Sequence, residues 1–346
     1  MSLELILAGI MLVSLTFYAL LGGADFGAGA WALLARGPRG PAQEQLIARA
    51  IAPIWEANHV WLILVVTILF TAFPPAFATI TTRLHMPLTL MLIGIVLRGA
   101  AFAFQISATE ADGGGYREGR RWERLFAVAS LLTPILLGVT IGAIASGGIK
   151  EEDTGFLDRF VWDWLAPFPI AVGFFALALF AFLAAVYLTV EAKDPHLQED
   201  FRRRALASAA LVAILAVIVF VLSKRGAPGI PRDLSQSWWG WSLLPLAVIL
   251  ALGAVFGLWH RRFVLARLLA AGEVVAILWG WALTQFPFLV EPTITIYNAA
   301  ASPQTLRLLL VAIIAGAVLL FPSLYYLFRV FKRHALLPPS TSKAGP

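Results

Sequence analysis

The chain alternates long apolar runs with short polar connections, most of which carry arginine. Each run is about 20 residues or longer, the length that an α-helix needs to cross the hydrocarbon core of a bilayer. Strands of a membrane barrel would be shorter and would alternate apolar and polar residues, so the pattern favours helices. We predict nine membrane-spanning helices, at about residues 5–34, 47–73, 76–105, 124–146, 164–190, 204–223, 240–259, 265–288 and 305–329.

Two local signals support the predicted boundaries. The second and third spans are separated only by F-P-P-A-F, residues 73–77, where two prolines force a tight reversal. Ser302 and Pro303 suit the N-cap and the first helical position of the last span.

Composition gives the same fold class. Hydrophobic residues make up 60% of the 346 positions and charged residues only 13%, about half the share of a soluble domain. The sequence therefore predicts an all-α membrane protein. The connections are too short to hold a soluble domain, a nucleotide-binding loop or a nucleic-acid module, so we expect no nucleic-acid partner.

The basic residues are distributed unevenly between the two sides of the membrane. The connections after the first, third, fifth and seventh spans, with the C-terminal tail, hold 18 of the 26 lysines and arginines. Cytoplasmic connections carry this excess in membrane proteins. The distribution predicts an N-terminus outside and a C-terminus in the cytoplasm, followed by a disordered tail at 334–346. The acidic connection at 150–163 is interpreted as a solvated loop.

The chain has no cysteine, which excludes disulfides, thiolate metal sites, iron–sulfur clusters and a cysteine nucleophile. His59 and His85 are candidate haem or metal ligands by residue type. Their predicted depths differ, however, because His85 lies near the outer end of its span and His59 lies closer to the midplane. We therefore expect no haem and no metal site in this chain.

Five ionisable residues stand out because they lie well inside the predicted spans: Asp25, Glu56, His59, Arg98 and Glu273. Such groups are expensive in hydrocarbon and face protein or water instead. At a rise of about 1.5 Å per residue, the three carboxyl residues and Arg98 each lie about 11 to 13 Å from the predicted cytoplasmic end of their span. His59 lies one turn deeper than Glu56 on the same helix face.

This shared level allows two interpretations. Consecutive antiparallel helices usually pack as neighbours, so Arg98 is the natural counter-charge for Asp25, Glu56 or both. The pair could be structural and fix helix register. Alternatively, two acids facing one base leave a carboxyl group that can hold or release a proton, which suits a proton path. Gly23 and Gly27 lie four residues apart beside Asp25 and allow a neighbouring helix to approach closely.

Four motifs together resemble subunit II of the cytochrome bd-type quinol oxidases. They are L-G-G-A-D-F-G-A-G-A-W at 21–31, W-E-A-N-H-V-W-L-I at 55–63, T-R-L-H-M-P-L with G-I-V-L-R-G-A-A-F-A-F at 82–104, and N-A-A-A-S-P-Q-T-L at 298–306. The likeness extends from the first span to the last. The W-E-A-N-H-V-W form is similar to the branch called cyanide-insensitive oxidases.

The resemblance implies a fold of two four-helix bundles, at 1–150 and 160–290, and a peripheral ninth helix at 303–333. It implies a heterodimer with a homologous subunit I, which holds two b-type haems, one d-type haem and the quinol site. The complex would oxidise quinol and reduce dioxygen to water in a prokaryotic cytoplasmic membrane, generating a proton gradient without pumping. A small single-helix accessory subunit and a structural quinone or lipid are further partners that the resemblance leaves open.

The resemblance also assigns roles to individual residues. Glu56 matches an acid implicated in a proton path, Asp25 and Arg98 match the acid of the first span and the arginine of the third, and Trp61 matches an aromatic residue near a proposed oxygen access route. This chain departs from many members, which have Asp, Gly and Gln where it has Glu56, Ala57 and His59. Two alternatives remain: a stand-alone ion-coupled permease, and a subunit with a purely structural role in assembly.

Overall fold

A computed structural model describes residues 2–51, 55–110, 116–149 and 155–334. Within these ranges the chain forms thirteen helices and one two-stranded antiparallel hairpin. The elements are α1 (Leu3–Leu33), α2 (Gly40–Ile51), α3 (Trp55–Ala72), α4 (Pro74–Arg83), α5 (His85–Glu110), α6 (Tyr116–Ala145), α7 (Phe156–Phe160), α8 (Pro167–Glu191), α9 (Pro195–Gly226), α10 (Gly229–Gln236), α11 (Gly240–Trp259), α12 (Phe263–Gln285), β1 (Phe288–Val290), β2 (Ile294–Thr295) and α13 (Pro303–His334).

The predicted all-α membrane fold is confirmed. Among the described residues, eight helices are long and apolar enough to cross a membrane, and α3 with α4 makes a ninth if this bent pair is one span. The predicted cap of the last span is also confirmed, because the Ser302 hydroxyl accepts the Thr305 amide at 3.4 Å and α13 begins at Pro303. The tail at 335–346 lies outside the described residues.

The predicted boundaries of the second and third spans are wrong. The apolar run at 47–73 is described as two helical parts, the end of α2 as far as Ile51 and α3 from Trp55, and residues 52–54 lie outside the described residues. The run at 76–105 is also divided: α4 bends away from α3 by 117°, and the spanning helix is His85–Phe104 within α5. Pro74 and Pro75 occupy the first turn of α4, where a proline ring needs no N–H partner, so they start a new helix after Phe73.

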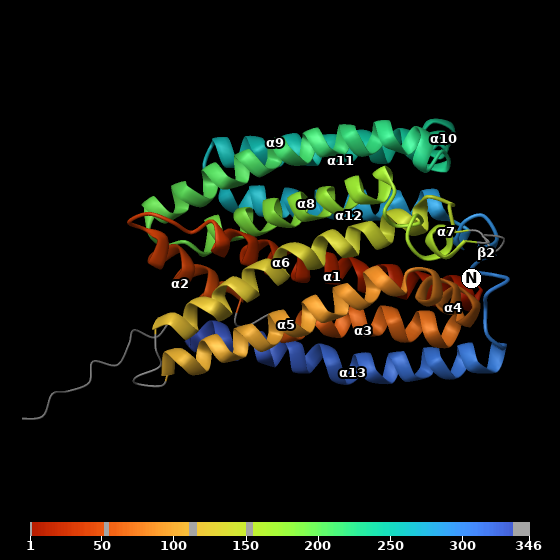
Figure 1. Cartoon of the computed structure of the whole chain (residues 1–346), viewed down its shortest axis with the longest axis horizontal. Helices are drawn as coiled ribbons and strands as arrows, with labels where there is room; N and C mark the ends of the chain where they lie inside the picture. Colours follow the sequence, from red (N-terminus) through yellow and green to blue (C-terminus); the bar gives the residue numbers. More distant parts are fainter. Residues whose placement is uncertain (1, 52–54, 111–115, 150–154, 335–346) are drawn as a thin grey trace, which may run out of the picture.

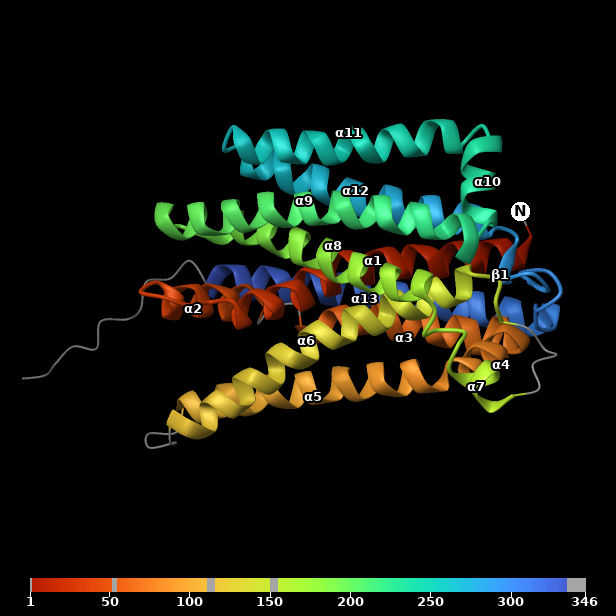
Figure 2. The same ribbon diagram turned by 45° about the horizontal axis from the view of Figure 1, so that its top comes forward.

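The long helices run side by side, and the short elements gather at the two ends (Figures 1 and 2). α2 lies at one end, beside the ends of α5, α6 and α9. The N-terminus, α4, α7, α10 and the hairpin lie at the other. By the charge distribution, the α2 end is the predicted cytoplasmic side.

α8 is the central helix and packs against α1, α6, α9 and α12. Two of these contacts depend on glycine. A Cβ atom at Gly27 of α1 would lie 2.0 Å from the carbonyl oxygen of Phe180 in α8, and one at Gly138 of α6 would lie 2.7 Å from the carbonyl oxygen of Val172. The helix that approaches the predicted glycine stripe of α1 is therefore α8. The predicted division into bundles at 1–150 and 160–290 stays a prediction, and helices from both ranges share this interface.

α13 packs along α3 and α1 and leaves most of its large apolar side chains exposed. This placement is compatible with the predicted peripheral ninth helix at 303–333.

Candidate functional site

Asp25 is fully buried in the C-terminal half of α1, within the glycine-rich part of that helix. The small residues around it let α8 approach, which keeps lipid away from the carboxylate. A buried carboxylate needs hydrogen-bond donors and a counter-charge, and both are supplied by neighbouring helices.

Arg98 of α5 supplies the counter-charge. Its Nη1 donates to Asp25 Oδ2 at 2.8 Å, and its Nη2 contacts Oδ1 and donates to the Asp25 backbone oxygen at 3.2 Å. The third donor, Nε, bonds the Ser130 hydroxyl of α6 at 2.9 Å. This bidentate geometry matches the fork of the guanidinium, and both partners are almost completely buried. The predicted pairing of Arg98 with Asp25 is confirmed by these contacts.

Two aromatic rings sandwich the Arg98 guanidinium. Its Cζ lies 4.6 Å from the ring centroid of Phe26 and 4.8 Å from that of Phe126. Cation–π contact is strongest where water is excluded, as it is here. The carbonyl oxygen of Phe126 also accepts a hydrogen bond from the Ser130 hydroxyl at 2.7 Å. Phe126 therefore contacts Arg98 through its ring and orients, through its carbonyl, the hydroxyl that Arg98 Nε bonds.

Asn58 connects the ion pair to a histidine. Its Nδ2 donates to Asp25 Oδ2 at 2.7 Å, and its Oδ1 contacts His59 Nδ1. Because a carboxylate only accepts hydrogen bonds, the amide nitrogen of Asn58 must face Asp25 and its carbonyl must face His59. His59 Nδ1 therefore carries a proton, and Nε2 is the ring nitrogen that can take up or release one.

Beyond His59, toward the middle of the span, lie two buried groups whose polar atoms have no hydrogen-bond partner in the described part of the chain. These atoms are the Tyr18 hydroxyl and the Trp61 indole nitrogen. The Tyr18 ring meets the His59 ring edge-on at 6.4 Å, and Trp61 stacks on Phe17 at 4.5 Å. Trp61, the predicted oxygen access residue, is thus a buried packing residue next to the site, and its proposed role stays a prediction.

Two predicted site residues are not connected to this cluster by the described contacts. The backbone of Glu56 lies in the first turn of α3, two residues before Asn58, but its side chain lies outside the described residues. Its predicted depth therefore stays a prediction. Glu273 is buried in α12, and its Oε2 has no hydrogen-bond partner among the described residues. Its role in a proton path stays a prediction.

The site also contains residues that sequence reasoning missed. Asn58 and Ser130 both bond the ion pair directly, yet neither is ionisable and so neither was a candidate. The only signal for Asn58 was an amide in an otherwise apolar run. Ser130 gave no signal, because many membrane helices bond serine hydroxyls to their own carbonyls.

The two candidate haem ligands do not face a common position. His59 lies against Asn58, Tyr18 and Phe26, whereas His85 Nδ1 contacts the Thr82 carbonyl oxygen at 3.0 Å and packs on Phe160 near the other end of the molecule. Within the described ranges, no group of three or more His, Cys, Asp or Glu residues could hold a metal ion. His59 and His85 therefore could not hold one haem iron between them.

The fold and the site define a multi-pass helical membrane protein with a charge pair buried between four helices. The sequence model of the family described as cytochrome bd terminal oxidase subunit II matches residues 3–331, and the chain belongs to this family. It is therefore a subunit of a bacterial respiratory quinol oxidase complex, whose other principal component is subunit I. This assignment sets aside the stand-alone permease.

Similar proteins agree with the family assignment. A Bacillus subtilis (strain 168) protein whose name includes "cytochrome bd menaquinol oxidase subunit II" is 22% identical over 328 residues, which are 91% of this chain and 92% of the relative. The "cytochrome bd-I ubiquinol oxidase subunit 2" of Escherichia coli (strain K12) is 23% identical over 222 residues, 63% of this chain and 54% of that protein. The solved structure of the bd oxidase from Geobacillus thermodenitrificans matches with a TM-score of 0.78 at 23% identity, covering 96% of this chain and 99% of that chain, which shows a shared fold.

Proposed function

We propose that this subunit delivers protons from the cytoplasm toward the oxygen-reducing centre of its partner. In this proposal subunit I carries the two b-type haems and the d-type haem and oxidises quinol, and this chain binds no haem. The observation that carries the proposal is the hydrogen-bonded series from Arg98 through Asp25 and Asn58 to His59. A structural ion pair would need only its two charged members, whereas this one orients a titratable ring.

The residues have different roles in the proposed path. Asp25 and Arg98 neutralise each other, so a proton held beside them meets little net charge. Asp25 fixes the amide of Asn58, and Asn58 in turn fixes the tautomer of His59. We assign the transfer itself to groups that can change protonation state, namely His59 Nε2 and the carboxyl group of Glu56, which lies on the same helix one turn before it.

The alternative is that the cluster serves assembly alone, and two substitutions separate the proposals. Asn58→Leu keeps the ion pair but disconnects His59, and Glu56→Gln removes a carboxyl group with little change of shape. Asn58→Leu removes two hydrogen bonds, which cost about 1 kcal/mol for a neutral bond and about 1.5 to 3 kcal/mol for a bond to a charged group, while the Arg98 contacts still compensate Asp25. We expect both variants to assemble. We expect oxygen consumption by the purified complex to fall about tenfold or more, at unchanged haem content.

Thr133→Val is the matched control. Thr133 is as buried as Asn58, but within the described part of the chain its hydroxyl bonds only the Ala129 carbonyl of its own helix, at 2.8 Å. This variant should consume oxygen at the wild-type rate. Wild-type rates in assembled Asn58→Leu and Glu56→Gln complexes would leave the structural role standing and refute the proton path.

A further inference from the structure

A cavity of about 450 Å³ lies at the predicted cytoplasmic end, enclosed by α1, α2, α5 and α6. We call it the α2 vestibule. The residues used below that line it are Arg36, Glu44, Ala48, Phe102, Arg124 and Phe126. Its lining includes charged side chains from α2, from α6 and from the connection between α1 and α2, so it offers water a polar surface at the predicted membrane boundary.

The inner wall of the α2 vestibule is the outer wall of the buried site. Phe126 lines the cavity, and the same ring lies 4.8 Å from Arg98 Cζ. Phe102 lines the cavity beside it, with its ring centroid 5.9 Å from that of Phe126. A single layer of aromatic side chains therefore separates the cavity from the Asp25–Arg98 pair. Aromatic side chains change rotamer far more easily than helices move.

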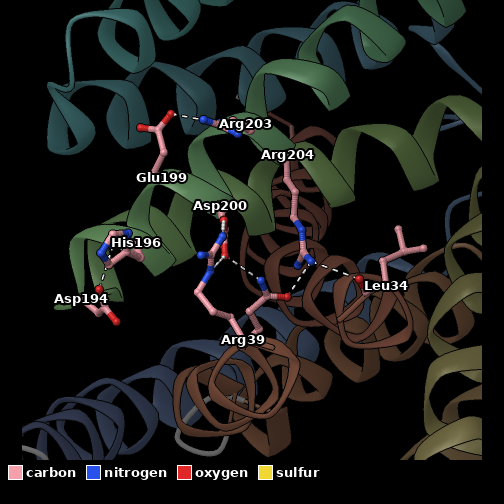
Figure 3. A network of polar contacts seen from close by, with 9 residues as sticks. Leu34, Arg39, Asp194, His196, Glu199, Asp200, Arg203 and Arg204 are labelled. Atoms are coloured by element: carbon pink, nitrogen blue, oxygen red, sulfur yellow. Dashed lines mark hydrogen bonds and ion pairs between the residues drawn. The ribbon is translucent and has the colours of Figure 1, made fainter. Parts of the chain in front are cut away.

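α2 covers the vestibule, and a network of polar contacts fixes its position (Figure 3). Arg39, just before α2, forms a bidentate pair with Asp200 of α9 at 2.7 and 2.8 Å. Gln43 Nε2 donates to Asp200 at 2.8 Å, and Arg204 Nη2 donates to Gln43 Oε1 at 2.7 Å and to the Leu34 carbonyl oxygen at 3.1 Å. These contacts attach one face of α2 to α9 and leave Glu44 and Ala48 on the cavity.

The lining of the α2 vestibule carries both kinds of charge. Glu44 lies on α2, Arg36 follows α1 by three residues, and Arg124 lies in the third turn of α6. All three side chains are exposed, so they contact bulk water. The Phe126 ring contacts the buried Arg98, which bonds Ser130 and Asp25.

We propose that the α2 vestibule is where cytoplasmic protons enter this subunit, with Phe126 as the barrier between its water and the buried Asp25–Asn58–His59 series. The inference rests on the proposed function and adds its point of uptake. It predicts that filling the vestibule slows turnover even though every residue of the buried site is intact.

The experiment uses the absence of cysteine from this chain. Ala48→Cys places a thiol on the vestibule wall, and Ala42→Cys places one on the same helix away from the cavity; both positions are exposed. The complete oxidase complex is purified first, and its oxygen consumption is measured before and after modification with a bulky maleimide. Because labelling follows assembly, each protein serves as its own folding control.

We expect modification of the Ala48→Cys complex to lower oxygen consumption at least threefold, with haem content and melting temperature unchanged. A small methylating disulfide reagent should have a weaker effect at the same thiol. The Ala42→Cys complex should keep its rate after complete modification, as should the wild-type complex, which controls for cysteines of the partner.

Mass spectrometry establishes the extent of labelling. Full labelling of Ala48→Cys without a change of rate would overturn the inference. If Asn58→Leu and Glu56→Gln slow the enzyme while the filled vestibule does not, the uptake point is wrong but the proton path stands. If none of these changes slows it, the proposed function fails as well.

Discussion

The carboxyl groups of Asp25 and Glu291 are both removed from water, but they differ in the partners that compensate their charge. Asp25 is buried, and the guanidinium of Arg98 and the amide of Asn58 compensate its carboxylate. Glu291, in the hairpin at the predicted outer end, is half-buried, and its hydrogen-bond partner within the described residues is Gln285 Nε2, at a long 3.4 Å. Burial, and then the negative charge of Asp233, raise the pKa of Glu291, and Arg232 opposes this in part.

The raised pKa makes a stability prediction with a definite sign. The folded protein binds this proton more tightly than the unfolded chain, so the cost of the carboxylate is absent below the unfolded pKa of about 4.3 and grows as pH rises through the folded pKa. Glu291→Gln should therefore melt above wild type at pH 8, and the difference should shrink toward pH 5. Thermal unfolding of the purified complex measures both; a difference that does not vary with pH would contradict the explanation.

At the scale of elements, the fold depends on helices that touch backbone to backbone. α1 meets α8 at Gly27, where a methyl group would collide with the Phe180 carbonyl oxygen. The same approach brings the Trp31 indole nitrogen within 2.7 Å of the Ala181 carbonyl oxygen. Since α1 carries Asp25, this contact also sets the position of the ion pair.

Gly27→Ala should destabilise the protein because α1 and α8 must separate to admit the methyl group. Overpacking of this kind typically costs about 1 to 3 kcal/mol. Gly9→Ala is the matched control: it lies in the same helix, and a Cβ there would have nothing within 4 Å. We expect a lower yield and melting temperature for Gly27→Ala only. Equal behaviour of the two variants would mean that the contact is not needed.

The sequence predicted that the elements are membrane-spanning helices more accurately than it predicted where each helix begins and ends. Apolar run length identified the spans, because hydrocarbon thickness imposes it. It could not divide 47–73, since the apolar residues of α2 that pack against protein look the same in sequence as those that face lipid. Shared depth and the packing of consecutive helices predicted Arg98 as the counter-charge of Asp25, Glu56 or both, and the contacts show Asp25. Asn58 and Ser130 could not be found this way, because depth says nothing about which neutral side chain points toward a charge.

At the scale of the whole molecule, the two ends differ in chemistry. The α2 end carries the Arg39–Asp200 and Arg204 contacts, and Glu199 adds pairs with Arg202, Arg203 and Arg261. The opposite end has α10, the hairpin and exposed tryptophans such as Trp238 and Trp241. An arginine-rich cytoplasmic end and an aromatic outer boundary are the arrangement that membrane insertion favours.

This asymmetry predicts the orientation of the protein. Ser235→Cys on α10 should react with a membrane-impermeant maleimide in intact spheroplasts. Ala42→Cys on α2 should react only after the membrane is permeabilised. Both side chains are exposed, so access to the reagent decides the result. The reverse pattern would invert the topology and place the α2 vestibule outside the cell.

The buried ion pair has a consequence for how the protein is made. Asp25 and Arg98 are separated by 73 positions in the chain. At about 5 to 20 residues per second, the ribosome delivers the acid roughly 4 to 15 s before its counter-charge. A lone aspartate inside a membrane helix opposes transfer into lipid, by about 2.5 to 3.5 kcal/mol at the helix centre and by less at the off-centre position of Asp25. The first helix is therefore expected to wait at the translocon, or beside an insertase, until the fifth emerges.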